Sequence, residues 1–583
     1  MEALRRRVSL LDSFPQPSET VVLFAGLSVI LCAGLQYSFA TYSKDLKDAL
    51  SLSQSQVEVL GLGKDIGGYV AFAQGLFYDA YGPRRTIAVG ALLQAAGFLS
   101  LFLLVPAASS RLGSVPPLWQ PFLALLAASN GAGWLDMATM MTLLHNASAE
   151  RAMAGGVAKS LLGLGAAVFS NVYVSFLEPS HSLSGEAGKL ARRHATRSYL
   201  LLCCLAPLAI SLTALPFVAR LPRPEPHLAR RSPARAHRLY LLGGWVASLC
   251  LYLLLANRLT AVRPDGAEAG HSVRVGTTVA LILLLVLPPS LLCLLNLSTA
   301  AASTVALAEH REALLGPTAQ EDNAPCPDTT SVPDAACSLP PKLRGQRVTD
   351  LTLAACMRCV DFWLLCTAMC LGSGCALVLV NNLAQLSDAI GSRQAVTSLV
   401  ALFSVCNASG RLLQGALSDF SLRMGSTPPI NLVIGLLLMA CTQLALARAT
   451  PATLPFCVAI TGLCFGSYWS FVPVAAGELF GGRHAGSIYG VIGASPALGS
   501  FLLNTLVAGR VYDRHTLASP PPALGAPPPR AARCEGEDCF ALTFAICSST
   551  CVFAALCAYV LLVRTRHMYV RTAPATERLP PPP

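Results

Sequence analysis

Charged residues are scarce in this sequence: Asp, Glu, Lys and Arg make up 13% of its 583 residues, where a soluble globular chain carries about 25%. Hydrophobic residues make up 54%. The deficit excludes an ordinary soluble protein and indicates that lipid surrounds most of the chain. The net charge of +11 comes mostly from short segments between apolar runs, which is typical of membrane proteins and does not indicate nucleic-acid binding.

The sequence also lacks the motifs that would indicate a pump or an enzyme. It has no Walker A phosphate loop, no His-Glu-x-x-His zinc motif and no convincing nucleophile elbow. Most of the 21 cysteines lie within apolar runs, and no Cys-x-x-Cys pair comes with a second pair or with histidine partners. We therefore expect neither an ATP-driven transporter nor an enzyme, and we expect no metal or other cofactor.

Apolar runs long enough to cross a bilayer, about 20 residues each, recur along the whole chain. Two long polar connections divide them into groups of six, two and six. The sequence therefore predicts an all-α membrane protein with two six-helix bundles and two extra spans between them, 12–14 transmembrane helices in total. The predicted spans are 20–42, 57–79, 86–106, 118–144, 153–177, 198–219, 239–256, 275–297, 360–382, 396–418, 430–448, 452–476, 484–508 and 540–563.

The polar connections set the predicted domain limits. Loops 298–350 and 514–538 and the tail 573–583 are rich in Pro and Ala and lack apolar periodicity, which favours disorder. On an external loop, Cys534 and Cys539 could form a local disulfide or remain free thiols. The predicted segments are a tail (1–19), the N-terminal bundle (20–219), a basic loop (220–238), two additional helices (239–297), a disordered loop (298–359), the C-terminal bundle (360–563, with an external loop 509–539) and a tail (564–583).

Basic residues in alternate connections predict the orientation of the chain in the membrane. One side of the membrane collects Arg84, Arg85, the arginines of 220–238 and the basic residues near both ends of the chain. Because basic connections are usually cytosolic, this pattern predicts that both termini lie in the cytosol. The connection 178–197 disagrees, because it is predicted to be external yet carries four basic residues. The rule is statistical, and we expect a multi-pass protein with cytosolic termini, in the plasma membrane or in a vacuole-like organelle membrane.

The first and last groups of six contain matching segments in the same order. Gly75-Leu-Phe-Tyr-Asp79 ends the second span of the first group, and Gly415-Ala-Leu-Ser-Asp419 ends the second span of the last group. Cys32-Ala-Gly34 similarly parallels Cys370-Leu-Gly372. Each match is weak alone, but their shared order predicts two pseudo-symmetric halves with a solute site between them.

Several of these segments resemble a known family. Gly75, Asp79 and Gly82 followed by two arginines are similar to the inter-helix signature of the major facilitator superfamily. The segments that resemble its nodulin-like family are Gly34-Leu-Gln-Tyr37-Ser-Phe39, Leu60-Gly-Leu-Gly-Lys64-Asp65-Ile-Gly67, Asp361-Phe-Trp-Leu-Leu365 and Asn407-Ala-Ser-Gly410-Arg411. The family is more distantly similar to monocarboxylate and oxalate/formate carriers. The resemblance covers roughly 20–180 and 360–510, and it implies alternating access for a small solute such as an organic anion.

The resemblance also implies a gate at the cytosolic ends of the helices. A carboxylate there can meet the positive N-terminus of a helix in the other half. Asp79 would face the helix that begins near His484, and Asp419 the helix that begins near Met153; the alternative is an aspartate solvated at a helix end. The gating residues implied are Gly75, Asp79, Gly82, Arg84, Arg85, Gly415 and Asp419.

Charged residues inside predicted spans are the main candidates for solute or proton contact, because an intramembrane charge is costly. Lys64 and Asp65 point about 100° apart on a helix, so we expect one to line a cavity and the other to be buried. Either they bind solute or a proton, or they form ion pairs with another helix. Asp136 and Lys159 lie at similar depth on neighbouring antiparallel spans, and could form a structural pair or a gating pair.

In the C-terminal half, Arg411 is the strongest candidate for binding an anion, because a guanidinium matches a carboxylate. Its alternative is a pair with Asp419, two turns further along the helix. Asn382 is a further candidate. Aromatic residues in spans can line a cavity or anchor helices at the membrane interface, and those considered are Tyr37, Trp134, Tyr468 and Trp469.

The sequence thus predicts a monomeric secondary active transporter of a small solute such as a monocarboxylate. Its expected partners are the solute, protons and the lipid bilayer. A proton could be carried by Asp65 or Asp136. The alternative function is a transporter-like sensor that binds solute without net flux.

Overall fold

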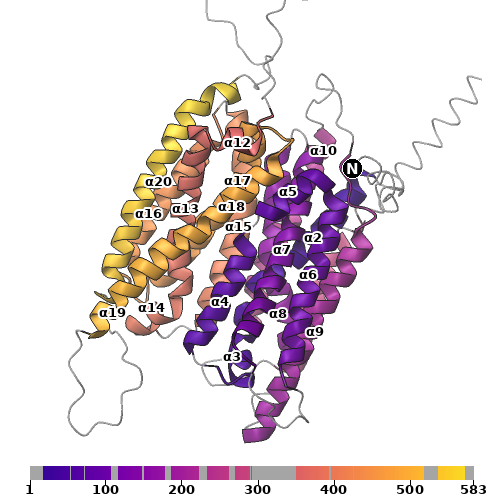
Figure 1. The fold of residues 1–583 in the computed structure, drawn as a ribbon, viewed down its shortest axis with the longest axis vertical. Helices are drawn as coiled ribbons and strands as arrows, with labels where there is room; N and C mark the ends of the chain where they lie inside the picture. Colours follow the sequence, from indigo (N-terminus) through magenta and orange to yellow (C-terminus); the bar gives the residue numbers. More distant parts are fainter. Residues whose placement is uncertain are drawn as a thin grey trace, which may run out of the picture.

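The computed structural model consists of helices over the residues it describes (Figure 1). No strand occurs within these residues. They are 18–52, 54–70, 72–106, 116–147, 150–177, 185–221, 233–260, 270–288, 290–291, 350–392, 396–424, 426–517, 536 and 538–570.

The N-terminal part of the chain forms one bundle, coloured indigo to magenta in Figure 1. Its second predicted span is broken into two helices after Tyr69, shortly after the pair Gly67-Gly68, and glycine is a poor helix former. The elements are α2 (Glu19–Ala33), η1 (Gly34–Tyr37), α3 (Phe39–Ala49), α4 (Gln54–Tyr69), α5 (Phe72–Tyr81), α6 (Pro83–Leu104), α7 (Trp119–Asn146), α8 (Arg151–Val172), the π-helix η2 (Tyr173–Leu177) and α9 (Gly185–Ala214).

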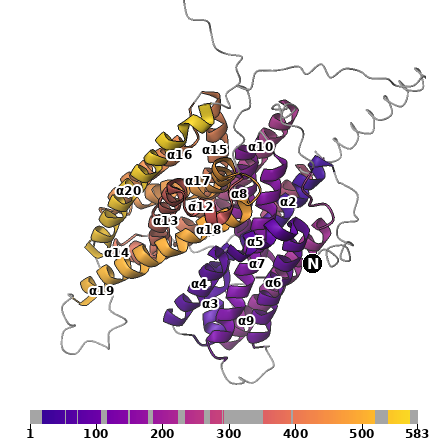
Figure 2. The same ribbon diagram turned by 45° about the horizontal axis from the view of Figure 1, so that its top comes forward.

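The C-terminal part forms a second bundle beside the first, coloured orange to yellow (Figures 1 and 2). Its elements are α12 (Leu353–Cys356), α13 (Val360–Asn381), α14 (Leu383–Ala389), α15 (Val396–Arg423), α16 (Pro429–Leu446), α17 (Leu454–Phe480), α18 (Ala485–Ser500), the π-helix η4 (Phe501–Ala508), α19 (Gly509–Leu517) and α20 (Asp538–Val570).

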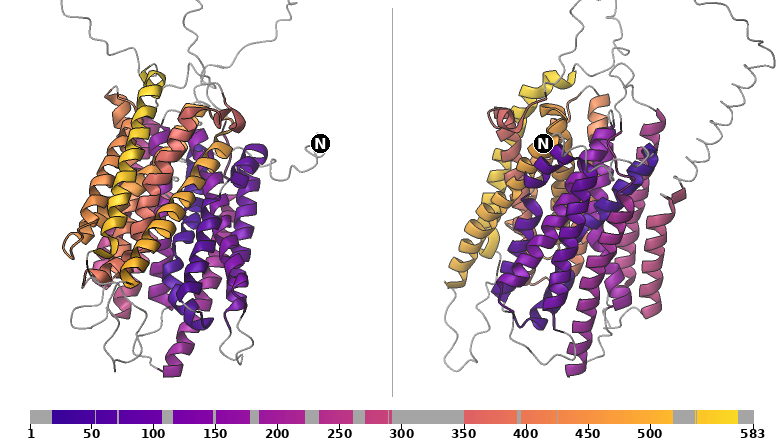
Figure 3. Two further views of the ribbon diagram at one scale, coloured as in Figure 1. Left: turned by 60° about the vertical axis from the view of Figure 1, so that its left-hand side comes forward. Right: turned by 45° about the vertical axis from the view of Figure 1, so that its right-hand side comes forward.

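The two additional helices are α10 (Pro233–Thr260) and a helix over His271–Pro288. The long helix α10 packs against α8 in the first bundle and against α15 in the second. The helix over His271–Pro288 lies on the outside of the protein (Figure 3), and only 11% of its apolar window is buried. This exposure is what a helix in contact with lipid requires.

The predicted membrane fold is confirmed. Eleven helices of the described residues are long and apolar enough to cross a membrane. The other three predicted spans are helical as well, in α4 with α5, in α7 and in α15. Helices α4 and α5 are each too short to cross a bilayer alone, while α7 and α15 have 28 residues each and carry Asp136 and Arg411 within them.

Helices continue into several segments that the sequence predicts to be loops or tails. The end of the predicted disordered loop 298–359 is ordered: Thr352 caps α12, and Asp350 accepts a hydrogen bond from the backbone N–H of Arg483. Residues 298–349 lie outside the described residues. Helix α10 begins within the predicted loop 220–238, α19 extends into 509–539, and α20 extends into the predicted tail 564–583.

The structure bears on two points that the sequence left open, the pairing of Cys534 with Cys539 and the basic connection 178–197. Cys539 is disulfide-bonded, while Cys534 lies outside the described residues. In the basic connection 178–197, the guanidinium of Arg197 donates to the carbonyl of Val105 and lies 4.2 Å from the ring centroid of Phe102. Arg197 is thus engaged within the bundle, so its charge is a poor guide to orientation.

The two bundles meet most closely at one end, which we call the Asp79 end: here α2 begins and α5 ends, and the sequence predicts it to be cytosolic. A Cβ added to Gly75 of α5 would lie 2.2 Å from the carbonyl oxygen of Gly486 in α18. Gly156 of α8 faces Gly415 of α15, where an added Cβ would lie 3.2 Å from the Cα of Gly415. At the opposite end, α3 and α14 pack mainly within their own bundles. Glycine therefore allows the halves to close at the Asp79 end.

We predict that Gly75→Ala loosens this closure, because its methyl group would overlap the carbonyl of Gly486 and push α5 away from α18. Hydrogen–deuterium exchange of the purified protein should show faster exchange in both helices. Gly244→Ala is the matched control, since no atom lies within 4 Å of a Cβ added there. Unchanged exchange in Gly75→Ala would contradict the close approach.

Candidate functional site

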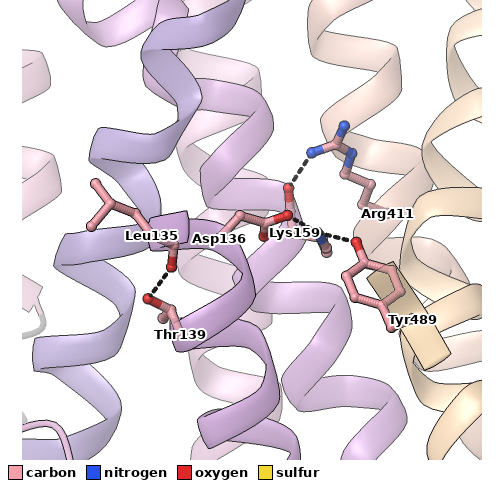
Figure 4. A network of polar contacts seen from close by, with 6 residues as sticks. All are labelled: Leu135, Asp136, Thr139, Lys159, Arg411 and Tyr489. Carbon is pink, nitrogen blue, oxygen red and sulfur yellow. Dashed lines mark hydrogen bonds and ion pairs between the residues drawn. The ribbon is translucent and has the colours of Figure 1, made fainter. Parts of the chain in front are cut away.

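A buried ion pair lies where the two bundles face each other (Figure 4). The ammonium Nζ of Lys159 on α8 donates to both carboxylate oxygens of Asp136 on α7, at 2.7 and 2.6 Å. It also donates to the hydroxyl of Tyr489 on α18, at 2.9 Å. The Lys159 side chain is 2% exposed and that of Asp136 is 16% exposed. The predicted pair is thus present, and Tyr489 extends it across the interface between the halves.

Arg411 on α15 joins the same network from the other half (Figure 4). Its Nη1 donates to the backbone carbonyl of Lys159 at 2.7 Å, and its Nε donates to the side-chain oxygen of Asn407 at 3.1 Å. The alternative that Arg411 pairs with Asp419 is wrong, because its guanidinium points across the interface to α8. With Asn407 and Lys159 as partners, the buried charge of Arg411 has no carboxylate bonded to it among the described residues.

Aromatic rings surround these two cations. The Arg411 guanidinium lies 5.9 Å from the ring centroid of Tyr37, and Lys159 Nζ lies 5.3 Å from that of Tyr489 and 6.0 Å from that of Trp469. Trp469 of α17 stacks on Tyr69 of α4, with centroids 5.7 Å apart. Cation–π attraction at such distances stabilises a buried charge without neutralising it. These rings, too, come from both halves.

Next to this network is a small cavity, which in this conformation has room for about one water molecule. It is lined by Gln36, Tyr37, Lys64, Asp65, Gly68 and Tyr69. The expectation that Lys64 and Asp65 point apart is wrong: Lys64 Nζ lies 2.7 Å from Asp65 Oδ1, and both residues line the cavity. The Cα–Cβ bonds of adjacent residues do diverge on a helix, but the long lysine side chain bends back to its neighbour.

The gating aspartates occupy the closed Asp79 end. The Asp79 carboxylate accepts a hydrogen bond of 2.9 Å from the backbone N–H of Ser487, in the first turn of α18, which is the helix that the resemblance implied. Asp419 is buried and accepts a hydrogen bond of 3.2 Å from Tyr240 of α10. The neighbour of Asp419, Gly415, packs on α8. The additional helix α10 therefore takes part in this closure.

The arginines of the gating motif hold the first bundle together. Arg84 follows Gly82, whose φ of 78° lies in the left-handed region that glycine adopts readily. Its guanidinium donates to the backbone carbonyl of Pro216 at 2.8 Å. Arg85 is the third residue of α6, which begins at Pro83. This turn thus fixes the end of α5, and with it Asp79, against the end of α9.

Three candidate residues are not part of this site. The indole N–H of Trp134 donates to Asn130 on the same helix, and its ring packs on Phe77. The hydroxyl of Tyr468 donates to the carbonyl of Gly435, inside the second bundle. The amide of Asn382 donates to Asn504 at 2.6 Å and so joins α13 to η4. Each of these contacts lies within a single half.

Sequence reasoning missed Gln36, Tyr69 and Tyr489. Gln36 is adjacent to the selected Tyr37, and Tyr69 lies one helical turn after the selected Asp65, so their position in spans was a usable signal. Tyr489 follows the glycines that begin α18, and nothing in the sequence around it indicates a partner in the other half. Only the packing of α18 against the first bundle reveals its contact with Lys159.

The chain matches two family models and one full-length relative over most of its length. Residues 19–293 match the family model described as Nodulin-like, and residues 347–571 match that described as NFD4, C-terminal domain. Protein NUCLEAR FUSION DEFECTIVE 4 of Arabidopsis thaliana is 23% identical over 576 residues, which cover 96% of this chain and 89% of that protein.

Two further similarities are more limited. Probable transporter MCH1 of Saccharomyces cerevisiae is 24% identical over 163 residues, 27% of this chain and 33% of the yeast protein. The crystal structure of the double Trp XylE mutants superposes with a TM-score of 0.53 at 12% sequence identity, covering 95% of this chain and 98% of that one. At this identity the structural likeness shows the fold alone.

We predict that Lys159→Met strongly destabilises the protein, because it leaves the carboxylate of Asp136 without its cation in a largely buried position. Breaking a buried pair in this way costs about 3–5 kcal/mol. The double variant Asp136→Asn with Lys159→Met should recover a large part of the loss. Thermal unfolding of the purified protein measures both effects.

The matched control is Asp361→Asn, which removes the carboxylate of an exposed pair with Arg564. Exposed pairs contribute about 0–1 kcal/mol, so this variant should unfold near the wild-type temperature. A double variant less stable than Lys159→Met alone would contradict the assignment of a buried pair.

Proposed function

The chain belongs to the Nodulin-like family of the major facilitator superfamily, and from this we propose that it is a secondary active transporter of a small carboxylate-bearing solute. It is an integral, multi-pass membrane protein with the superfamily fold. The solute class, the coupling to protons and the roles of individual residues are our proposal.

The observation that carries this proposal is the Lys159 network between the halves. Alternating access requires contacts between two bundles that can form and break as a whole. On one side of this network lie the Asp79–Ser487 and Tyr240–Asp419 hydrogen bonds, which close the Asp79 end. On the other side is the cavity with Lys64 and Asp65. This arrangement supports a conformation in which solute reaches the cavity from the α3 end.

The same network offers a route for coupling to protons. Lys159 is held between Asp136 in its own half and Tyr489 in the other. Protonation of Asp136 would remove its negative charge and weaken its hold on the ammonium group. The ammonium would then be free to shift within the interface, and its bond to Tyr489 would be lost. In our proposal, protonation of Asp136 thus favours separation of the halves at this layer.

We assign solute recognition to the cavity. Arg411 and Lys159 lie in the adjacent layer, between the cavity and the Asp79 end. Both of these cations are occupied by protein partners in this conformation. Tyr37 connects the two levels, since it lines the cavity and its ring centroid lies 5.9 Å from the guanidinium of Arg411. A solute in the cavity would therefore act on the contacts between the halves through the tyrosine rings.

We predict that membrane vesicles containing the protein take up its solute faster when an inward-directed proton gradient is imposed. To identify the solute, metabolites would be compared in cells with and without the gene, and the compounds that change would be tested in vesicles. The double variant Asp136→Asn with Lys159→Met, which leaves no buried charge unpaired, should retain uptake down a solute gradient and lose its response to the proton gradient. Asp361→Asn again serves as the control.

Uptake that ignores the proton gradient in the wild type would remove the coupling from the proposal. Specific binding of a solute without any flux would instead favour a transporter-like sensor. If neither flux nor binding is found for the compounds that change in cells, the transport function itself is overturned.

A further inference from the structure

We propose that the cavity around Lys64 and Asp65 selects solutes that carry an ammonium group as well as a carboxylate, as a free amino acid does. This inference rests on the proposed function and specifies the chemical class of its solute. A zwitterion differs from a simple organic anion such as a monocarboxylate, because its net charge is zero.

The charge of the cavity is the first argument. Its lining contains one ammonium and one carboxylate and no further charged side chain, so the net charge of the lining is zero. A lone carboxylate that bound Lys64 would separate it from Asp65 and lie beside an uncompensated negative charge. A lone amine that bound Asp65 would leave the positive charge of Lys64 uncompensated. A zwitterion can replace the single Lys64–Asp65 pair with two pairs, one for each of its charged groups.

The second argument is that this ion pair does little for the fold. Lys64 and Asp65 are neighbours on α4, so the contact between them joins no two elements. Their side chains are 20% and 35% exposed, and accessible ion pairs contribute little to the stability of a fold. Among the described residues, neither side chain forms an ion pair with another helix. Charges that lie within a membrane segment and stabilise little indicate a functional site.

The remaining lining suits the uncharged parts of such a solute. Gly68 leaves space for the amide of Gln36, since a Cβ added there would lie 2.6 Å from Gln36 Oε1. The rings of Tyr37 and Tyr69 provide apolar surface together with hydroxyl groups. In this conformation the cavity has room for about one water molecule, so binding such a solute requires the rings of Tyr37 and Tyr69 and the side chain of Lys64 to move aside.

The neighbours of the cavity would let its occupant affect the gate. Tyr69 stacks on Trp469 of the second bundle. The ring centroid of Tyr37 lies 5.9 Å from the guanidinium of Arg411, which also belongs to the second bundle. Both tyrosines belong to the first bundle. A solute that orders these rings would therefore change contacts between the halves, as a transported solute must.

Three matched probes test the inference on the purified full-length protein: alanine, propionate, which lacks the ammonium group, and ethylamine, which lacks the carboxylate. Leucine, 4-methylpentanoate and 3-methylbutylamine form a second set with a larger side chain. Isothermal titration calorimetry should show that the amino acid of at least one set binds about tenfold or more tightly than either of its partners, a difference of about 1.4 kcal/mol.

Two charge variants supply a readout that a structural role would not produce. Asp65→Asn leaves Lys64 as the only charge, so the preference should shift from the amino acid to the matched acid. Lys64→Gln leaves Asp65, so it should shift towards the matched amine. Asp361→Asn, which alters an exposed pair away from the cavity, should keep the wild-type preference. Thermal unfolding of each variant shows whether the fold is retained.

The inference is overturned if the acid binds the wild type as tightly as the amino acid, if no amino acid binds, or if the folded charge variants keep the wild-type order. These results differ from a failure of the proposed function. If vesicles take up a simple organic anion and no amino acid binds, the selectivity for zwitterions is overturned, while the proposed transport function stands. If amino acids bind but no flux is found, the transport function is overturned, while the selectivity for zwitterions stands.

Discussion

The contact of Lys159 with Asp136 and Tyr489 is the interaction on which the arrangement of the two halves depends. It places a desolvated ammonium group at the interface, bonded to a carboxylate in its own bundle and to a hydroxyl in the other. A buried charge is tolerated only while its partners stay in place. The contacts of this interface should therefore either all persist or all break together. A transporter with two conformations needs such behaviour.

The glycines around this layer allow the contact to form. Helix α8 approaches α15 at Gly156 and Gly415, and α5 approaches α18 at Gly75. At such distances the backbone carbonyl of Lys159 comes within reach of Arg411, and the N–H of Ser487 within reach of Asp79. Small residues thus bring the backbones together, and the polar contacts then give the interface its specificity. The additional helix α10 adds a contact at the same end through Tyr240 and Asp419.

Charge is distributed differently on the two sides of this layer. Towards the Asp79 end, the described contacts pair a carboxylate with a backbone N–H or a hydroxyl group, and they close the path. In the cavity, Lys64 and Asp65 are paired with each other alone among the residues that the structure describes, and both remain accessible. In our proposal, the same residue types therefore serve a structural purpose at one level and remain available for a solute at the other.

The sequence alone determined the membrane class, the helical fold with duplicated halves and the family, because apolar run length and motif order are local properties. It also identified Lys64, Asp65, Asp136, Lys159 and Arg411, since charges in spans are conspicuous. Only the tertiary structure decided their partners. Arg411 points to α8 and not to Asp419, Lys64 bends back to Asp65, and Tyr489 reaches Lys159 from a helix 330 positions away in the chain. Such pairings depend on side-chain conformation and on how two bundles dock, and neither is encoded in residue spacing along the chain.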